Sequence, residues 1–420
     1  MEARWLAVVT VCVWVAGPAP AGSAVLEMTY EEVLEAALSA PGLSRLAARL
    51  RTAEAAVLDA GTYPYNPEIE IEGADRDAAS GATTDRGVRF AQRLELAGQR
   101  RERLAVAEAA LTVDREGLAR ARRELLAEAA LTFAEAATRR DLVEVERSDA
   151  ELARDFASLV ERRLEAGAAT AVEVALAQAG LARAERGLAV AEGLFRGAQA
   201  RLAEVTGAAE ALVAPVGGLP ESNAPTLLDD LVAEAMSSRR DLAAARVGVE
   251  MSEARLRLAR AERVPDLTVE ARASREEDDD LVGLGLAVPL PLFERNQGRI
   301  AEAEAAILAA EADLAARELA VRREVAEAHG RLTASLDARR LADRLGVTPL
   351  EEGLALLERA FEAGKIGAAE LLLYRRELVE GQRRAIEARA QVWEAATALA
   401  VATGTAPAGA ESLEDEEVEP

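Results

Sequence analysis

The sequence predicts a mainly α-helical chain with a small β part, in which long coiled-coil helical hairpins are joined to four β-strands. Three observations predict this fold class. Apolar residues recur every seven positions in two long segments, and two other segments alternate between apolar and polar or small residues. Ala, Leu, Glu and Arg dominate a chain that is 50% hydrophobic, 30% charged and only 3% aromatic. This composition is typical of long packed helices rather than of a thick globular core.

The first 24 residues predict a signal peptide, so the mature chain is expected to be exported. Arg4 precedes an apolar stretch of about 13 residues, which Pro18 and Pro20 end before small residues at a cleavage site. A buried first helix is the alternative, and the two prolines disfavour it. Cys12 is the only cysteine and lies within this stretch, so the mature chain is expected to lack thiols.

The remaining sequence contains two copies of one pattern, displaced by 196 to 198 positions. The seven-residue apolar steps are Leu104, Leu111, Leu118 and Leu125 in the first copy and Ile300, Ile307, Leu314 and Val321 in the second. Non-helical landmarks recur in the same order, as Pro67 and Pro265, Leu94 and Leu290, Gly167 and Gly364, and Gly207 and Gly404. A seven-residue repeat is a coiled-coil seam, and the shared landmarks indicate two structural repeats.

Each copy is expected to contain a first helix, a β-hairpin, a very long helix and a return helix. The expected ranges are 30–62, 67–96, 97–165 and up to Gly207 in the first copy, and 227–263, 265–292, 294–362 and up to Gly404 in the second. An uninterrupted helix of this length reaches about 100 Å. Gly346 and Pro349 are expected to interrupt the second long helix.

The expected organisation is a signal peptide at 1–24, a first repeat at 25–207 and a second repeat at 226–405. A loop rich in Pro and Gly at 208–225 would join the repeats. Residues 406–420 lack an apolar pattern and carry six acids from Glu411 to Glu419, which predicts a disordered acidic tail.

The predicted strands have one wholly apolar face. Val282, Leu284, Leu286 and Val288 alternate with Gly and Ala, which predicts that these four side chains face lipid. The strands are about nine to eleven residues long, as a tilted bilayer span requires, and polar loops at 75–86 and 274–280 close the hairpins. Tyr63, Tyr65 and Phe293 at the helix-side ends predict an interfacial aromatic girdle. Gln92 interrupts the apolar face of the first hairpin, where a bulge would account for it.

Four strands cannot close a barrel by themselves. A bilayer offers no water to unpaired N–H and C=O groups at a sheet edge, so strands cross it only as a closed barrel. Several chains would therefore share one barrel, and three chains would contribute twelve transmembrane β-strands. A small soluble sheet that caps a helical bundle is the alternative interpretation of the strand pattern.

Together these features resemble the TolC family of outer-membrane efflux proteins. Within it the sequence is most similar to the branch that serves heavy-metal cation pumps of the cobalt-zinc-cadmium and copper-silver type. The resemblance extends from Met28 to Gly404 and is most specific at residues 94–101, at residues 288–298 and at the Glu-Ala-Gly turns 165–167 and 362–364. It implies a homotrimer with a shared trimeric 12-stranded β-barrel in the bacterial outer membrane, in contact with lipid, and a long helical tunnel in the periplasm.

The resemblance also implies a function and its partners. The chain would be a passive channel of a tripartite efflux system, without cofactor or catalysis. It would dock to a periplasmic adaptor (membrane fusion) protein and an inner-membrane pump of the resistance-nodulation-division type. Heavy-metal cations are the expected substrate, and drugs are the alternative.

The same resemblance implies roles for particular residues. The turns between long and return helices would form the periplasmic tips that dock the adaptor, which places Ala166, Gly167 and Ala168, and Ala363, Gly364 and Lys365, at the docking surface. Some family members carry two aspartates shortly after the second tip, which form acidic rings. Glu370 corresponds to the first and matches it in charge, which makes it the expected channel constriction, whereas Leu373 replaces the second.

Composition excludes several other classes of function. A formal charge of -24 disfavours nucleic acid as a partner and suits small cations. His329 is the only histidine, and the methionines are scattered, so neither a metal site nor a catalytic triad is expected. A secreted periplasmic coiled-coil adaptor or scaffold without a pore is the runner-up function. This alternative does not explain the four strands, which have aromatic residues at their ends and lie at matching places in both copies.

Overall fold

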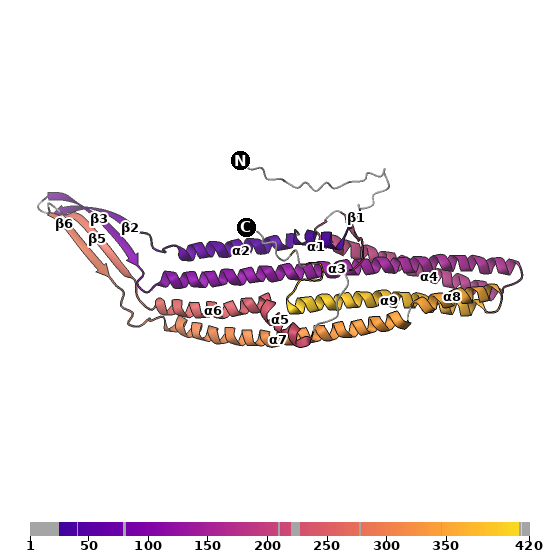
Figure 1. Ribbon diagram of the computed structural model, residues 1–420. Coiled ribbons are helices and arrows are strands. Elements are labelled where there is room, and N and C mark those ends of the chain that lie inside the picture. Colours follow the sequence, from indigo (N-terminus) through magenta and orange to yellow (C-terminus); the bar gives the residue numbers. More distant parts are fainter. Residues whose placement is uncertain are drawn as a thin grey trace, which may run out of the picture.

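The computed structural model describes residues 25–39, 41–78, 81–208, 211–219, 227–276, 279–345, 347–410 and 413. The predicted signal peptide, Gly346 and most of the predicted acidic tail lie outside these residues. The described chain is a long rod with a β-sheet at one end and two helical turns at the other (Figure 1). No helix in the described ranges is both long enough and apolar enough to cross a membrane.

The helices form most of the chain, as predicted. They are α1 (Tyr30–Leu38), α2 (Pro41–Gly61), α3 (Gln99–Glu165), α4 (Ala171–Val205), α5 (Leu228–Ser238), α6 (Arg240–Ala261), α7 (Gln297–Leu345), α8 (Val347–Glu362) and α9 (Ala368–Thr403). The 67 residues of α3 make a helix about 100 Å long. All eight residues of the two heptad series are buried or half-buried. The prediction that these residues form packing seams is therefore confirmed.

Two of the predicted helices are divided. The range 30–62 forms α1 and α2, and the range 227–263 forms α5 and α6, which meet at Arg239. Arg239 has an extended backbone, and its guanidinium donates to the carboxylates of Asp241 and Glu324. Ion pairs with the neighbouring Asp241 and the distant Glu324 therefore stabilise a break that local propensity does not predict.

The second long helix is divided near the place predicted. α7 ends at Leu345 and α8 begins at Val347, and Pro349 lies in the first turn of α8. A proline is tolerated there because the first turn of a helix has no carbonyl partner for its N–H groups.

The sheet contains four antiparallel strands in the order β2, β3, β5, β6. Their bounds are β2 (Glu68–Ala78), β3 (Gly81–Leu94), β5 (Leu267–Glu276) and β6 (Asp279–Ala287). The predicted loops at 75–86 and 274–280 are wrong in extent, because strand pairing continues through most of both ranges. The predicted strand at Val288 is also wrong: β6 ends at Ala287, before Pro289 and Pro291, which cannot donate to a ladder.

The predicted bulge at Gln92 is absent. The pairing of β3 with β2 and with β5 runs without a skipped residue across this position. The Gln92 side-chain amide instead donates to the backbone carbonyls of Tyr65 and Arg93, at 3.0 and 2.9 Å. A polar residue on an apolar face is thus accommodated by hydrogen bonds at the base of the sheet.

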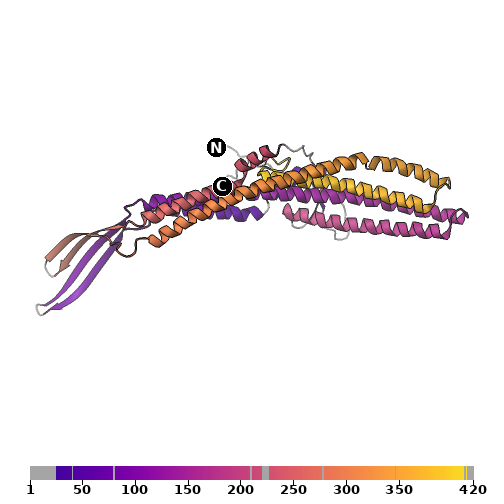
Figure 2. The ribbon, with the colours of Figure 1, turned by 90° about the horizontal axis from the view of Figure 1, so that it is seen from below.

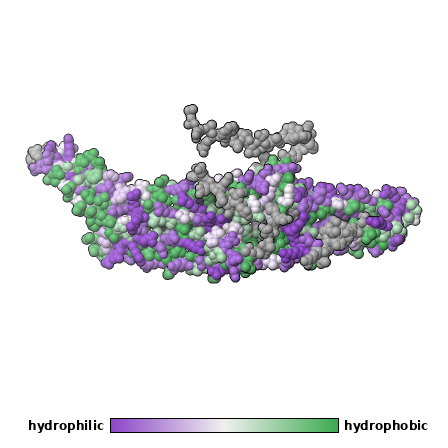
Figure 3. Space-filling view, in the orientation of Figure 1, coloured by the Kyte–Doolittle hydropathy of each residue, from purple (hydrophilic) through white to green (hydrophobic). Residues whose placement is uncertain are grey.

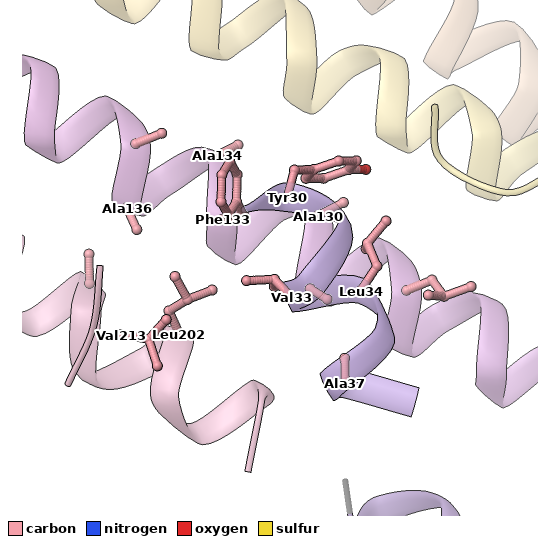
Figure 4. Close-up of a cluster of buried hydrophobic side chains, with 14 of the residues drawn as sticks. Tyr30, Val33, Leu34, Ala37, Ala130, Phe133, Ala134, Ala136, Leu202 and Val213 are labelled. Carbon is pink, nitrogen blue, oxygen red and sulfur yellow. The ribbon is translucent and has the colours of Figure 1, made fainter. Parts of the chain in front are cut away.

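A second, two-stranded sheet lies at the middle of the rod and was not predicted. β1 (Val25–Met28) pairs in parallel with β4 (Leu212–Pro215), which lies in the range expected to be a loop. Val213 is fully buried there, in a cluster with Leu34, Phe133 and Leu202 (Figure 4). Strand β4, within the connection between the repeats, is therefore packed into the core.

This central cluster also joins the two repeats. The Tyr30 ring packs edge-on against Phe133 at 5.4 Å and against Trp393 at 5.6 Å between centroids. The indole N–H of Trp393, from α9, donates to the carbonyl of Ala130 on α3. The aromatic residues of this chain are few, and three of them meet where α1, α3 and α9 cross.

Candidate functional site

The two turns at the far end of the rod have the same geometry. In the first, Ala168 N–H donates to the Arg163 carbonyl at 2.7 Å, and in the second Lys365 N–H donates to the Ala360 carbonyl at 2.8 Å. Gly167 and Gly364 adopt φ of 72° and 70°, which favours glycine because it has no Cβ. All six residues predicted as docking tips, 166–168 and 363–365, are exposed.

The two turns lie side by side, as both ribbon views show (Figures 1 and 2). The Arg163 guanidinium donates to the carbonyl of Phe361 at 2.8 Å and lies 4.6 Å from the centre of its ring. The Phe361 ring in turn packs on Phe156 at 5.2 Å. The structure thus brings together two exposed tips that are separated by 197 positions in the sequence.

The two glutamates that follow the tips differ in their partners. Glu173 forms a capping box with Thr170, whose backbone N–H donates to its carboxylate at 2.7 Å. This hydrogen bond holds the pKa of the Glu173 carboxyl below its ordinary value. Glu370 is exposed at the corresponding place in α9, but the residue before that helix is Gly367, which has no side chain to form a cap. Among the described residues, no hydrogen bond or ion pair is found for the Glu370 carboxylate.

The four-stranded sheet has one apolar and one polar face. Register places Leu284 beside Ala271, Phe90 and Ile69, and Val282 beside Ala273, Val88 and Ile71. Within the chain this face is bare: Leu284 is 87% exposed. Figure 3 shows hydrophobic residues gathered over the sheet, with hydrophilic residues at its outer end. Of the predicted lipid-facing residues, Val282, Leu284 and Leu286 share this face, and Val288 follows β6.

The opposite face of the sheet carries charged side chains. The Arg89 guanidinium on β3 lies between the carboxylates of Glu70 on β2 and Glu270 on β5, with ion pairs to both. Arg93 pairs with Asp266 at 2.8 Å near the helical end. In the part of the chain that the structure describes, no strand pairs with the outer edge of β2 or of β6, so the sheet has two open edges. One apolar face, one charged face and two open edges are the properties of a segment of a larger sheet.

The predicted interfacial aromatics occupy different settings. The Tyr63 hydroxyl donates to the Arg93 carbonyl at 2.8 Å and accepts from the Glu95 N–H at 2.9 Å. The Tyr65 ring packs against Tyr63 and lies 4.2 Å from the Arg93 guanidinium. Phe293, in contrast, is 92% exposed. The two tyrosines therefore join the connections between helices and strands, a role that sequence reasoning missed.

The described residues contain no group of three or more Asp, Glu, His or Cys side chains arranged to hold a metal ion. Carboxylates gather instead on the polar face of the sheet, where arginines neutralise some of them. Such an arrangement can attract cations weakly without coordinating them.

Comparison with known proteins identifies relatives along nearly the whole chain. The family model "Outer membrane efflux protein" matches residues 33–208 and 231–405. The cobalt-zinc-cadmium resistance protein CzcC of Cupriavidus metallidurans is 28% identical over 377 residues, covering 87% of this chain and 88% of CzcC. In structure, the outer membrane protein VceC of Vibrio cholerae superposes with a TM-score of 0.73 at 20% identity, covering 90% and 96% of the two chains. CusC superposes with a TM-score of 0.74 at 16% identity, covering 90% and 92%.

Proposed function

Because this chain belongs to the outer membrane efflux protein family, we propose that it is the outer-membrane channel of a tripartite efflux system. Three copies would share one barrel, and each would contribute the four strands β2, β3, β5 and β6. The observation that carries this proposal is the sheet with one apolar face, one charged face and two open edges. Closing such sheets into one barrel would place the apolar face against lipid and pair every edge.

The two ends of the rod would have different surroundings. The strands would lie in the outer membrane, with Val282, Leu284 and Leu286 toward lipid and Phe293, Tyr63 and Tyr65 near the interface. The helices would extend about 100 Å into the periplasm. The exposed tips at 166–168 and 363–365 would dock a periplasmic adaptor, which in turn would bind an inner-membrane pump. Their matching geometry supports a shared role.

Heavy-metal cations are the proposed substrate. CzcC is a cobalt-zinc-cadmium resistance protein by name, and its similarity to this chain extends over most of both sequences. The polar sheet face and the free carboxylate of Glu370 suit weak attraction of cations. A passive duct is better served by weak attraction, since tight coordination would slow release.

Gene deletion tests the proposal. The deleted strain should become more sensitive to cobalt, zinc or cadmium salts than its parent, and expression of the full chain should restore growth. A variant with Leu286→Arg, which should fail to insert, provides the matched control. Unchanged metal sensitivity together with increased drug sensitivity would contradict heavy-metal cations as the substrate. The proposed channel function would still stand. No change across metals and drugs would contradict efflux.

A further inference from the structure

A buried carboxylate lies where both repeats meet, in the half of α3 nearer the tip. Glu146 on α3 is 4% exposed, and its Oε1 accepts hydrogen bonds from the guanidinium of Arg383 on α9. Its other oxygen, Oε2, has no donor, and it is the one buried side-chain atom among the described residues in this condition. A buried polar atom without a partner is rare in proteins, because it loses its hydration without compensation.

Gly187 on α4 explains how the carboxylate fits. A Cβ atom added at Gly187 would lie 2.5 Å from Glu146 Oε2, closer than any ordinary contact. Glycine inside a helix is less favourable than alanine, so α4 is weakened locally by this residue. The space it leaves allows the carboxylate to lie flat between α4 and α9. The packing of α3, α4 and α9 at this place therefore depends on the small size of Gly187.

A second arginine attaches α9 to α3 nearby. Arg375 is 6% exposed, and its guanidinium donates to the carbonyls of Leu152 and Asp149 at 3.0 and 3.3 Å. Arg375 lies eight positions before Arg383, two turns closer to the tip. Beside Glu146, a groove of about 820 Å³ separates α4 from α9. At this place α9 is therefore held to the first repeat by discrete polar contacts beside a groove.

This ion pair is poorly suited to adding stability. Burial of the Glu146 carboxylate is costly, and one of its oxygens gains no hydrogen bond in return. The pair instead defines the position of α9 along α3, because the guanidinium can meet this carboxylate at only one place on that helix. Loss of Arg383 would leave the Glu146 charge buried without a partner, and loss of Glu146 would remove the contact that holds the half-exposed Arg383 in place.

We propose that Glu146, Gly187 and Arg383 form a clamp between the repeats that fixes the position of α9, and with it Glu370. Arg383 and Glu370 belong to the same helix, 13 positions and about 20 Å apart. The effect on conduction rests on the proposed function, whereas the effect on helix position does not. Glu146 and Gly187 are positioning residues in this account, since neither would contact a conducted ion.

The test uses spin labels in the full chain, whose only cysteine, Cys12, lies in the predicted signal peptide. Val172→Cys on α4 and Glu377→Cys on α9 are exposed sites for the labels, and dilution with unlabelled chains isolates distances within one copy. Gly187→Ala should shift the distance between the labels outward and broaden it. Gly193→Ala is the matched control, because it lies on the same helix and its added Cβ meets nothing within 4 Å.

Two further variants separate the clamp from general damage to the helix. Glu146→Gln should produce the same shift, and the double variant with Gly187→Ala should produce no more than either alone, since both act on one contact. Arg383→Lys should give a smaller shift, because it keeps the charge and loses the planar fork. In planar bilayers, Gly187→Ala should widen the spread of single-channel conductance, while Gly193→Ala should not.

Equal label distances in Gly187→Ala and Gly193→Ala would overturn the clamp, as would fully additive shifts in the double variant. A shift in distance with no channel activity in the parent protein would instead contradict the proposed function and leave the clamp standing. If Gly187→Ala does not assemble, the distances in Glu146→Gln and Arg383→Lys decide the question in the same way.

Discussion

The carboxylate of Glu173 accepts a 2.7 Å hydrogen bond from the backbone N–H of Thr170 and so closes the start of the first return helix. The second return helix has no such contact: Gly367, which stands in place of Thr170, supplies no capping side chain, and Glu370 is exposed. Two glutamates at equivalent places in the repeats thus have different roles available. One stabilises its own helix, and the other has a carboxylate free to act on a passing ion.

Cation selectivity should depend on Glu370 and not on Glu173. Three Glu370 carboxylates around a threefold axis would attract cations and repel anions. In planar bilayers Glu370→Gln should reduce cation preference, measured by reversal potential, with the largest effect at low salt, because screening limits the field to about 10 Å at 0.1 M. Glu173→Gln serves as the control. Altered selectivity in Glu173→Gln alone would assign the constriction to the first repeat.

Thr170→Ala should loosen the first tip. Loss of an N-cap costs about 1 kcal/mol, so amide hydrogen exchange in the first turn of α4 should accelerate roughly fivefold. Thr170→Ser should preserve the parent rate. Similar exchange in Thr170→Ala and parent would show that the cap is energetically unimportant.

The same capping contact should weaken in acid. The hydrogen bond from Thr170 lowers the pKa of Glu173 in the folded state. A group with a lowered folded pKa stabilises the fold above its unfolded pKa, and this stabilisation is lost as pH falls through the folded pKa. The difference between the parent and Glu173→Gln, whose side chain stays neutral at every pH, should therefore shrink in that range, measured as the ratio of their exchange rates at each pH. A constant ratio down to strongly acidic pH would contradict the assignment.

The two faces of the sheet should tolerate charge differently. Leu286→Arg should impair assembly, since an arginine toward lipid near the middle of a bilayer costs about 2 to 4 kcal/mol per chain. Gly285→Ser on the polar face should be mild, because its Cβ would lie 3.6 Å from Glu270 Cβ, an ordinary contact. The assembly of each variant is measured by its yield in the outer membrane and by its heat-modifiable mobility on gels. Equal assembly of the two variants would mean that the faces are reversed or that no barrel forms.

Much of the helical architecture could be predicted because its signals are local. Heptads such as Leu104 to Leu125 define packing seams, and Gly167 and Gly364 end helices by their backbone conformation alone. The short strands β1 and β4 could not be found this way. Their pairing joins residues 187 positions apart, as Val25 and Leu212 do, within segments that lack any strand periodicity.

The site could be predicted only in part for the same reason. The exposed tips and the apolar alternation of Leu284 and Leu286 are readable from spacing. The capping box at Thr170 and Glu173 also has a sequence signature, a threonine followed three residues later by glutamate. The contact of Glu146 with Gly187 and Arg383 has none, because three separate helices must be placed before it exists.

Native mass spectrometry of the detergent-purified protein tests the central claim most directly, because a sheet with two open edges must find partners to cross a bilayer. The shared barrel predicts a trimer that survives in detergent and dissociates only when the strands unfold. A stable, folded monomer under the same conditions would contradict it.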